Sequence, residues 1–556
     1  MKRVLITISL LAACTALSAQ NLNPVVEVTN VYAREATGIE KPSQLLAVPD
    51  SVYKFDLDFD YSVKSTPYKG AYEFNPDLVQ LRPSARLSGE QTLYLKAGAG
   101  FRLHPEVDFV WNPLRTRNFR LDVYATHNSY IGHYRNIVVG DHSIDWDGTM
   151  QAGTGINSNT TAGAYLWTAF KGGEFSADLQ YRHLLAANVA HHRGQGQFRL
   201  QNAPGSRFLY SLGSRLAYLG SEYQKEFHTV SDLMMGFRFG GGSSLRVMLG
   251  AETVSFPYDG ESELAAKFDV APHYAFNKGR WNLDLGVKLA FMTRSVETIY
   301  PYKPGFIFPD VNVSFRASDA AVIYASATGG DRLTTYDSLL DDNPYLGAFS
   351  WHRDVIVNRF NVNAGLRGSI GGRFSYDIKG GFKWVDNAYG WSYFYLPSNF
   401  VSSAYIPLDE VEYMLIPTMA YVEPLRTFYV EGRLAWVSEH WDILASAYYG
   451  YTQKPELVGE VANNVLIPPA FTTRDHLFYK WGGRIKVGAT LEARSKLRGR
   501  TGIPAYQDLG IQADYAFSRH MAAWLKLGNL LNQTIQRTPF YAEAGIYGSV
   551  GVKLTF

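Results

Sequence analysis

The chain has few charges, one cysteine and no long apolar run, and each shortage narrows the class of protein. Charged residues make up 19% of the 556 residues, whereas soluble chains average roughly 25%. With only one cysteine, Cys14, the chain cannot form an internal disulfide. No run of about 18 apolar residues occurs, which excludes a membrane protein built from transmembrane helices.

Aromatic residues and glycine are abundant instead. Aromatics reach 14%, with tyrosine the commonest of them at 37, and there are 50 glycines. The 46% hydrophobic content is too high for a disordered chain. A composition rich in tyrosine and glycine, with a mean hydropathy of −0.15, favours a β protein.

The N-terminus indicates export. Lys2 and Arg3 precede an apolar stretch at 4–13 followed by small residues, which is typical of a secretory signal peptide at 1–19. A lipobox ending at Cys14 is the alternative, although a chain anchored by its own membrane-spanning wall gains little from a lipid. Cleavage after residue 19 leaves 51 basic and 51 acidic residues. That balance gives no electrostatic reason to expect nucleic acid.

Apolar residues alternate with polar ones through most of the chain. In 281–291, 373–384 and 509–518 every second residue is apolar, so one face of an extended strand is apolar and the other polar. Such runs last about 9–12 residues, which exceeds the usual soluble strand and suits a tilted membrane strand. The polar set holds Lys, Arg, Asp and Gly, and aromatics cluster at run ends. We therefore predict an all-β fold, a transmembrane antiparallel up-and-down β-barrel.

We place about 22 strands in the barrel at 91–556, and 16 to 20 strands are not excluded. The expected strands lie near 91–102, 104–114, 118–128, 145–157, 161–171, 174–190, 206–220, 230–240, 243–255, 261–276, 280–296, 309–317, 319–328, 359–371, 373–386, 427–437, 440–452, 471–480, 485–496, 506–517, 519–530 and 542–556. Long extracellular loops and short periplasmic turns should then alternate. The long connections 129–144, 297–308, 329–358, 387–426, 453–470 and 531–541 obey this rule, and the connection 191–205 breaks it.

The last strand carries an assembly pattern. Ser549-x-Gly551-x-x-Leu554-x-Phe556 resembles the C-terminal signal by which outer-membrane barrels are recognised for assembly. The closing strand must pair with the first one to remove the sheet edge, and its outer face must suit lipid. We therefore expect Val550, Leu554 and Phe556 to face lipid, and the barrel-assembly machinery to be a partner.

Further segments resemble TonB-dependent receptors. The stretch 524–532, with Asn529-Leu530-Leu531-Asn532, looks like the end of such a receptor barrel, and 341–346 looks like one of its long loops. Near the mature N-terminus a five-residue segment is similar to a TonB box, the short strand that pairs with the energising protein. Its residues are Val25, Val26, Glu27, Val28 and Thr29. The resemblance implies energised uptake across the outer membrane.

The segment 20–90 departs from that family. A plug domain needs well over a hundred residues with a compact αβ pattern, and these 71 residues contain six prolines and lack that pattern. The chain is therefore expected to be a receptor-type barrel without a recognisable plug, preceded by a periplasmic or luminal segment. Asp56, Asp58 and Asp60 are spaced as at the start of a calcium loop, but Tyr61 and Pro67 replace the Gly and Glu that such a loop needs.

No pattern indicates catalysis, a cofactor or a metal. The pairs Asp141-His142 and Asp475-His476 are interpreted as polar loop residues, and His191-His192 as exposed turn residues without a third ligand. The glycines at 240–242 are expected in a hairpin turn. We therefore expect a protein that is not an enzyme.

One long loop, 387–426, is crowded with aromatics. They form either a platform that stacks on a sugar or a partner protein, or a small core of the loop itself. The candidate binding residues are Tyr389, Trp391, Tyr393, Phe394 and Tyr395.

Two functions remain open. The first is a channel or receptor-type transport protein for small solutes or nutrients, and the second a non-transporting accessory or scaffold barrel in an assembly or export complex. Either places the chain in the outer membrane of a Gram-negative bacterium, with both termini periplasmic. Its surroundings would be outer-membrane lipid and lipopolysaccharide, with a surface lipoprotein or other envelope subunits as further candidate partners.

Overall fold

The computed structural model describes most of the chain from residue 92 onward. The described residues are 92–101, 104–133, 137–141, 146–150, 154–186, 189–203, 205–221, 224–258, 261–294, 305–346, 355–397, 413–453, 456–457, 465–499, 503–538, 542–543 and 545–556. The expected signal peptide, the segment 20–90 and the TonB-box-like residues 25–29 lie outside them.

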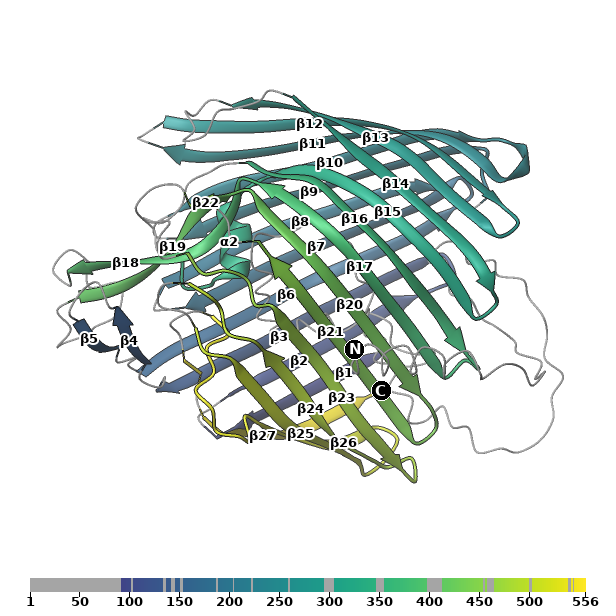
Figure 1. The fold of residues 1–556 in the computed structure, drawn as a ribbon. Helices are drawn as coiled ribbons and strands as arrows, with labels where there is room; N and C mark the ends of the chain where they lie inside the picture. Colours follow the sequence, from purple (N-terminus) through teal and green to yellow (C-terminus); the bar gives the residue numbers. More distant parts are fainter. Residues whose placement is uncertain are drawn as a thin grey trace, which may run out of the picture.

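The strands form a closed antiparallel barrel of 22 strands, as predicted (Figure 1). Its strands are β1 (Leu93–Gly100), β2 (Glu106–Arg115), β3 (Phe119–His133), β6 (Thr154–Phe170), β7 (Gly173–Ala186), β8 (Val189–Asn202), β9 (Phe208–Ser221), β10 (Lys225–Arg238), β11 (Ser243–Tyr258), β12 (Glu261–Lys278), β13 (Trp281–Arg294), β14 (Gly305–Ser318), β15 (Ala321–Leu333), β16 (Val355–Ile370), β17 (Phe374–Asp386), β20 (Leu425–Val437), β21 (Trp441–Thr452), β23 (Phe471–Trp481), β24 (Ile485–Arg494), β25 (Tyr506–Ala516), β26 (Met521–Gly528) and β27 (Tyr547–Thr555). Pairing of β1 with β27, from Tyr94↔Thr555 to Gly100↔Ser549, closes the sheet. Closure leaves no free edge.

The two ends of the barrel differ in their connections. At the end that holds the last residue, which we call the turn end, every connection between consecutive barrel strands has two to five residues. The opposite end, the loop end, holds the long connections 134–153, 295–304, 334–354, 387–424, 453–470, 495–505 and 529–546. The predicted segregation of long loops and short turns is therefore confirmed. The three glycines at 240–242 form the short turn η2 (Gly240–Gly242), as expected.

Two predicted assignments near the start of the barrel were wrong, and their errors cancelled in the strand count. The predicted strand 145–157 is instead β5 (Trp146–Met150), which pairs with β4 (Ile137–Asp141) outside the barrel, and β6 begins only at Thr154. The predicted connection 191–205 is largely β8, which pairs with β7 along its whole length. The outward positions of β8 include His192, Gly194 and Gly196 instead of apolar residues, so its alternation was hidden.

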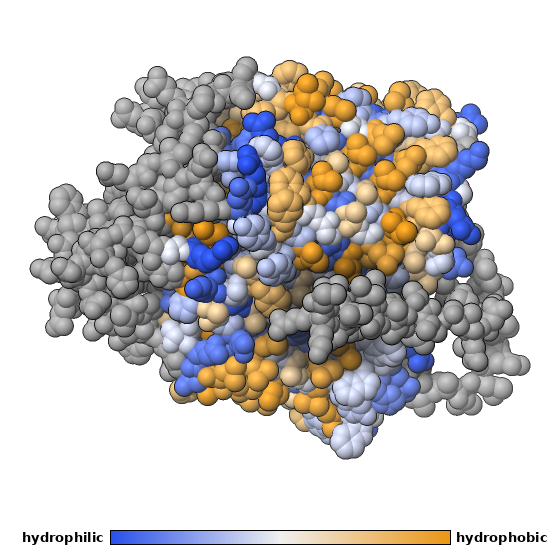
Figure 2. Space-filling view, viewed as in Figure 1, coloured by the Kyte–Doolittle hydropathy of each residue, from blue (hydrophilic) through white to orange (hydrophobic). Residues whose placement is uncertain are grey.

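Alternation along each strand separates an outer from an inner face. On β10, Phe227, Met235 and Phe237 are exposed on the outside, while Glu226 and His228 are buried on the inside. Figure 2 shows apolar side chains over much of the visible wall, with hydrophilic ones gathered toward both of its ends. An exposed apolar band on a closed barrel is the surface that a bilayer covers.

The closing strand has the predicted faces. Val550 and Val552 are exposed, whereas Ser549 and Thr555 are buried. Lys553 forms an ion pair of 2.6 Å with Asp514 of β25. Neighbouring side chains cover Ser549 on the inner face, where it is only 4% exposed.

Further elements fill the loop end. The helix α2 (Tyr336–Asp342) follows β15, and β18 (Ala388–Pro397), β19 (Tyr413–Glu423) and β22 (Glu456–Leu457) form a three-stranded sheet (Figure 1). Inward apolar residues of β11 to β16, including Phe256, Met292 and Phe308, form a buried cluster nearby. Within the described residues, no helix is both long and apolar enough to cross a bilayer.

Candidate functional site

The helix α2 lies inside the loop end of the barrel and contacts inward-facing side chains of the wall. Thr335 caps its N-terminus: the Thr335 Oγ1 accepts from Ser338 N at 3.0 Å, and Ser338 Oγ lies 3.3 Å from Thr335 N. This reciprocal capping begins a helix here. A helix of seven residues is too short to be stable alone, so the wall must hold it.

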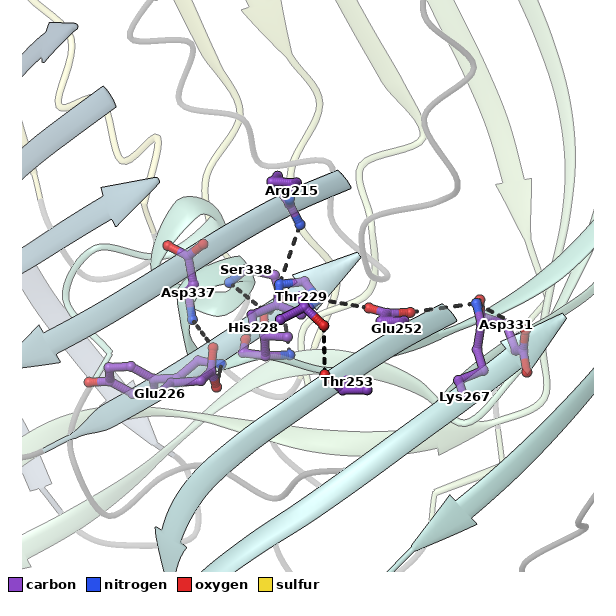
Figure 3. Close-up of polar contacts among 12 residues, drawn as sticks. Arg215, Glu226, His228, Thr229, Glu252, Thr253, Lys267, Asp331, Asp337 and Ser338 are labelled. Atoms are coloured by element: carbon purple, nitrogen blue, oxygen red, sulfur yellow. Dashed lines mark hydrogen bonds and ion pairs between the residues drawn. The ribbon is translucent and has the colours of Figure 1, made fainter. Parts of the chain in front are cut away.

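Glu226 of β10 makes the strongest backbone contact with α2. Its carboxylate accepts hydrogen bonds from Tyr336 N at 2.8 Å and Asp337 N at 3.4 Å (Figure 3). The negative charge also matches the positive end of the helix dipole. Glu226 is 2% exposed, so these amides supply the partners that a buried carboxylate requires.

The acidic side chains of α2 meet arginines of the wall. Asp341 pairs with Arg182 of β7 and, at 3.7 Å, with Arg193 of β8. Asp337 lies 3.2 Å from Arg193. Burial raises the pKa of the Asp337 carboxyl, and Arg193 opposes that rise. The helix α2 therefore contacts arginines of the wall at both its first and its last turn.

A chain of polar and charged contacts continues around the wall from β9 to β15. Arg215 lies 3.3 Å from His228 Nδ1, and His228 Nε2 lies 3.0 Å from Glu252. Lys267 lies 3.5 Å from Glu252 and donates to the Asp331 carbonyl at 2.7 Å (Figure 3). Removing one member of such a buried network is costly because it leaves the next one uncompensated. The network fixes the end of β15, from which α2 starts.

The aromatic candidates of the long loop are divided by the structure. Tyr389 and Trp391 of β18 are 0% and 1% exposed, and the Tyr389 hydroxyl donates to Asp342 at the end of α2. These two rings are therefore part of a core and are not available to stack on a ligand. The side chains of Tyr393, Phe394 and Tyr395 lie outside the described residues, so their role stays a prediction.

A second segment, 529–538, also folds against the inner wall. The guanidinium of Arg537 contacts three carboxylates: Glu492 at 3.2 Å, Asp508 and Glu543. Arg494 of β24 donates to the Gln536 carbonyl at 2.9 Å. The left-handed residues Asn529 and Asn532 turn the chain at the start of this segment. The Asn529-to-Asn532 stretch of the receptor resemblance thus forms the turn that directs 529–538 inward.

The histidine pairs that the structure describes lie in barrel strands. His191 and His192 are strand residues on opposite faces of β8 and do not lie in a turn. His191 is 3% exposed and packs near Tyr336, while His192 Nδ1 lies 2.6 Å from the Tyr181 hydroxyl on the outside. Asp475 and His476 likewise lie in β23 and not in a loop. His142 lies outside the described residues. Within the part of the chain that the structure describes, no group of three or more His, Cys, Asp or Glu could hold a metal ion.

Sequence reasoning missed the residues that seat α2. Arg182, Arg193 and Glu226 occupy inward strand positions, where alternation predicts polar side chains but not their partners. The segment 341–346 was noticed only through its resemblance to a receptor loop. Asp341 is 159 residues from Arg182, a separation at which no local pattern indicates pairing.

Comparison with known proteins identifies the fold. No protein-family model matches the sequence, and no curated protein matches it either. Solved structures do match. The FrpB iron transporter from Neisseria meningitidis has a TM-score of 0.61 at 9% identity, over 84% of this chain and 83% of that one. The chain has the same barrel fold.

Other solved structures agree. The siderophore receptor PirA from Acinetobacter baumannii has a TM-score of 0.58 at 10% identity, over 84% of this chain and 80% of that one. The ferric enterobactin receptor PfeA from Pseudomonas aeruginosa has a TM-score of 0.57 at 10% identity, with the same coverage. The predicted resemblance to the barrel domain of TonB-dependent receptors is confirmed for the fold. Identities this low say nothing of the ligand, since one fold hosts many functions.

Proposed function

We propose that this chain is an outer-membrane transport barrel that acts as a channel or receptor-type transporter for small solutes or nutrients, and is not an enzyme. The observation that carries the proposal is the loop end of the lumen. There α2 and the segment 529–538 fold inward and are seated by ion pairs to the wall. The ion pairs of α2 can be exchanged for contacts with water or a dissolved anion, whereas those of Arg537 hold 529–538 as a fixed part of the barrel.

The inner wall supports the same proposal. Lys96, Asp108, Asp514 and Lys553 show that charges of both signs line the closing seam. Keeping many charges inside a barrel is costly unless water or a polar solute reaches them. The similar structures are iron and siderophore transporters by name, which adds support from the fold.

We place the turn end, with both chain termini, in the periplasm and the loop end outside the cell. This follows the rule that outer-membrane barrels have short periplasmic turns and long outer loops. In the same proposal Ser549, Gly551, Leu554 and Phe556 form the assembly signal, and Val25–Thr29 binds the energising protein. Deleting Phe556 should slow assembly without weakening the barrel once it is folded, which a pulse-chase assay of heat-modifiable mobility separates.

Conductance of purified protein in planar bilayers tests the transport function. We expect ion current through the wild type or through a form lacking residues 20–85. Glu226→Gln should raise the open probability, because it weakens the anchor of α2. Asp232→Asn is the matched control, since Asp232 also faces inward on β10 but pairs with Arg199, at 3.4 Å. Membranes that stay closed with every form would refute the proposal.

The accessory-barrel alternative has one observation in its favour. A row of polar side chains crosses the outer face of four strands, in register from His127 through Thr160 and His183 to His192. His127 Nδ1 lies 2.7 Å from Thr160 Oγ1. Polar groups on an otherwise apolar wall suit contact with another envelope protein. Purification as a monomer in mild detergent, unchanged by His183→Leu with His192→Leu, would exclude this function.

A further inference from the structure

Two arginines face each other on the inner wall. Arg182 of β7 and Arg193 of β8 are directly opposite in the antiparallel register. Like charges in this position destabilise a pair of strands. The sequence nevertheless places both guanidinium groups here, with side chains only 14% and 12% exposed. A site of this kind requires an anion between or beside the two groups.

The anion in this structure comes from α2. Asp341 contacts both arginines, and Asp337 contacts Arg193. Residues four apart on a helix lie on one face, with Cβ atoms about 5–6 Å apart. The helix therefore presents two carboxylates to the arginine pair at the spacing of a short dicarboxylate.

The helix α2 packs against the wall with five of its seven residues buried, but it is not one of the barrel strands. It lies outside the barrel ladder and follows β15 through two connecting residues, Thr334 and Thr335. Its contacts with β7 and β8 are made by side chains, and the Asp341 side chain is 29% exposed. The Asp341 side of the contact is therefore its more exposed side.

We propose that Arg182 and Arg193 form a binding site for small organic dianions, and that Asp337 and Asp341 of α2 occupy it when no ligand is bound. The inference rests on the proposed transport function and names its substrate class: solutes with two carboxylates or equivalent anionic groups. Guanidinium groups bind carboxylates through paired hydrogen bonds. The ligand and α2 compete for the same donors, so binding and release of the helix are linked.

Neighbouring residues prepare the arginines for this role. Arg182 Nε donates to Asn159 Oδ1 at 3.0 Å, and Arg193 donates to Gln195 Oε1 at 2.5 Å. Both acceptors are neutral amide oxygens, so these contacts do not neutralise the positive charge that would bind the anion. The orientation is held from the wall and does not depend on α2.

Calorimetric titration of glutarate into purified protein in nanodiscs tests the site. Glutarate carries two carboxylates at roughly the spacing of those on α2, and neutral glutaramide is the control ligand. We expect weak binding to the wild type and about tenfold tighter binding to Asp341→Asn, because the internal competitor loses the charge that contacts both arginines. Arg182→Gln with Arg193→Gln should abolish binding, and glutaramide should not bind any form.

Asp514→Asn is the matched control variant. It removes another inward carboxylate, paired with Lys553 on the closing seam, and should leave glutarate affinity unchanged. Folding of each variant is checked by heat-modifiable mobility. If the double arginine variant does not fold, Arg182→Gln in the Asp341→Asn background replaces it and should reverse the tightening.

Three results would overturn the inference: equal affinity in wild type and Asp341→Asn, binding that survives loss of the arginines, or no binding to any form. The proposed function is judged separately, because the titration needs no current. If the barrel conducts ions but does not bind glutarate, the transport function stands and the proposed anion site is refuted. A barrel that binds glutarate as expected but passes no current retains the site and loses the transport function.

Discussion

The two segments that fold into the loop end are held by charges of opposite arrangement. The helix α2 carries carboxylates to a basic wall, where Arg182 and Arg193 receive them. The segment 529–538 carries one cation, Arg537, to an acidic site made by Glu492 and Asp508 of the wall. The geometry differs as well. Three carboxylates surround the Arg537 guanidinium, whereas the carboxylates of α2 approach the pair of Arg182 and Arg193 from the helix alone.

This difference predicts different behaviour. One guanidinium among three carboxylates is an integral part of the structure, since its loss leaves several buried negative charges together. Losing the carboxylates of the short helix is less costly for the two arginines, because an external anion can take their place. We therefore regard 529–538 as a fixed part of the barrel and α2 as an exchangeable one.

The largest expected effect is at Arg537. Arg537→Met should destabilise the barrel by about 3–5 kcal/mol, because Glu492, Asp508 and Glu543 lose their shared counter-ion. The urea midpoint of the folded band on gels measures this. Arg537→Lys keeps the charge without the planar fork and should fall between wild type and Arg537→Met. A loss below about 1 kcal/mol for the methionine variant would show that this segment is as exchangeable as α2.

Glu226→Ala should release α2 while leaving the barrel folded. Two amides of the first helical turn lose a charged acceptor, which costs about 2–3 kcal/mol of helix seating. Hydrogen–deuterium exchange of a peptide spanning 336–343 should accelerate, with exchange in β9 and β11 unchanged. Global unfolding would instead place α2 among the fixed parts and remove the contrast with 529–538.

Tyr389→Phe should have a smaller effect of the same kind. The hydroxyl donates to Asp342 at the C-terminal end of α2, and one hydrogen bond to a carboxylate contributes about 1–2 kcal/mol. Exchange of the α2 amides again measures it. Tyr376→Phe is the control, because its hydroxyl donates to the Ala320 carbonyl in a turn far from α2. Equal exchange in both variants would show that β18 does not hold the helix.

The smallest expected effect is a pH dependence of α2. Burial raises the pKa of Asp337, so the seated helix binds a proton more tightly than the released one. Seating should therefore be strongest below the ordinary carboxyl range and weaken as pH rises through the raised pKa. Exchange at 336–343, corrected for intrinsic rates, should be faster above the raised pKa than below the ordinary carboxyl range, and insensitive to pH in Asp337→Asn. Slower exchange at the higher pH would mean that the ion pair with Arg193 affects the pKa of Asp337 more than burial does.

Sequence patterns predicted the barrel well because the relevant physics is local. Alternating residues on 281–291 lie on β13, and the long loops lie at one end. The failure at β8 has the same origin: its outward His192, Gly194 and Gly196 lack the apolar signal, and pairing with β7 and β9 alone makes it a strand. Conversely, 145–157 looked like a barrel strand but contributes β5 to a separate hairpin.

The sequence by itself determined the class of fold and the two faces of most strands, because period-2 hydropathy is set by neighbouring residues and a closed barrel is the way such strands remove their edges. Only the tertiary structure decided what occupies the loop end of the lumen. The contacts of Glu226 with Asp337 and of Arg182 with Asp341 join residues more than a hundred positions apart. The strength of these contacts depends on burial and on distances of a few ångströms. The curvature of the closed wall brings the residues this close, and no local sequence pattern encodes it.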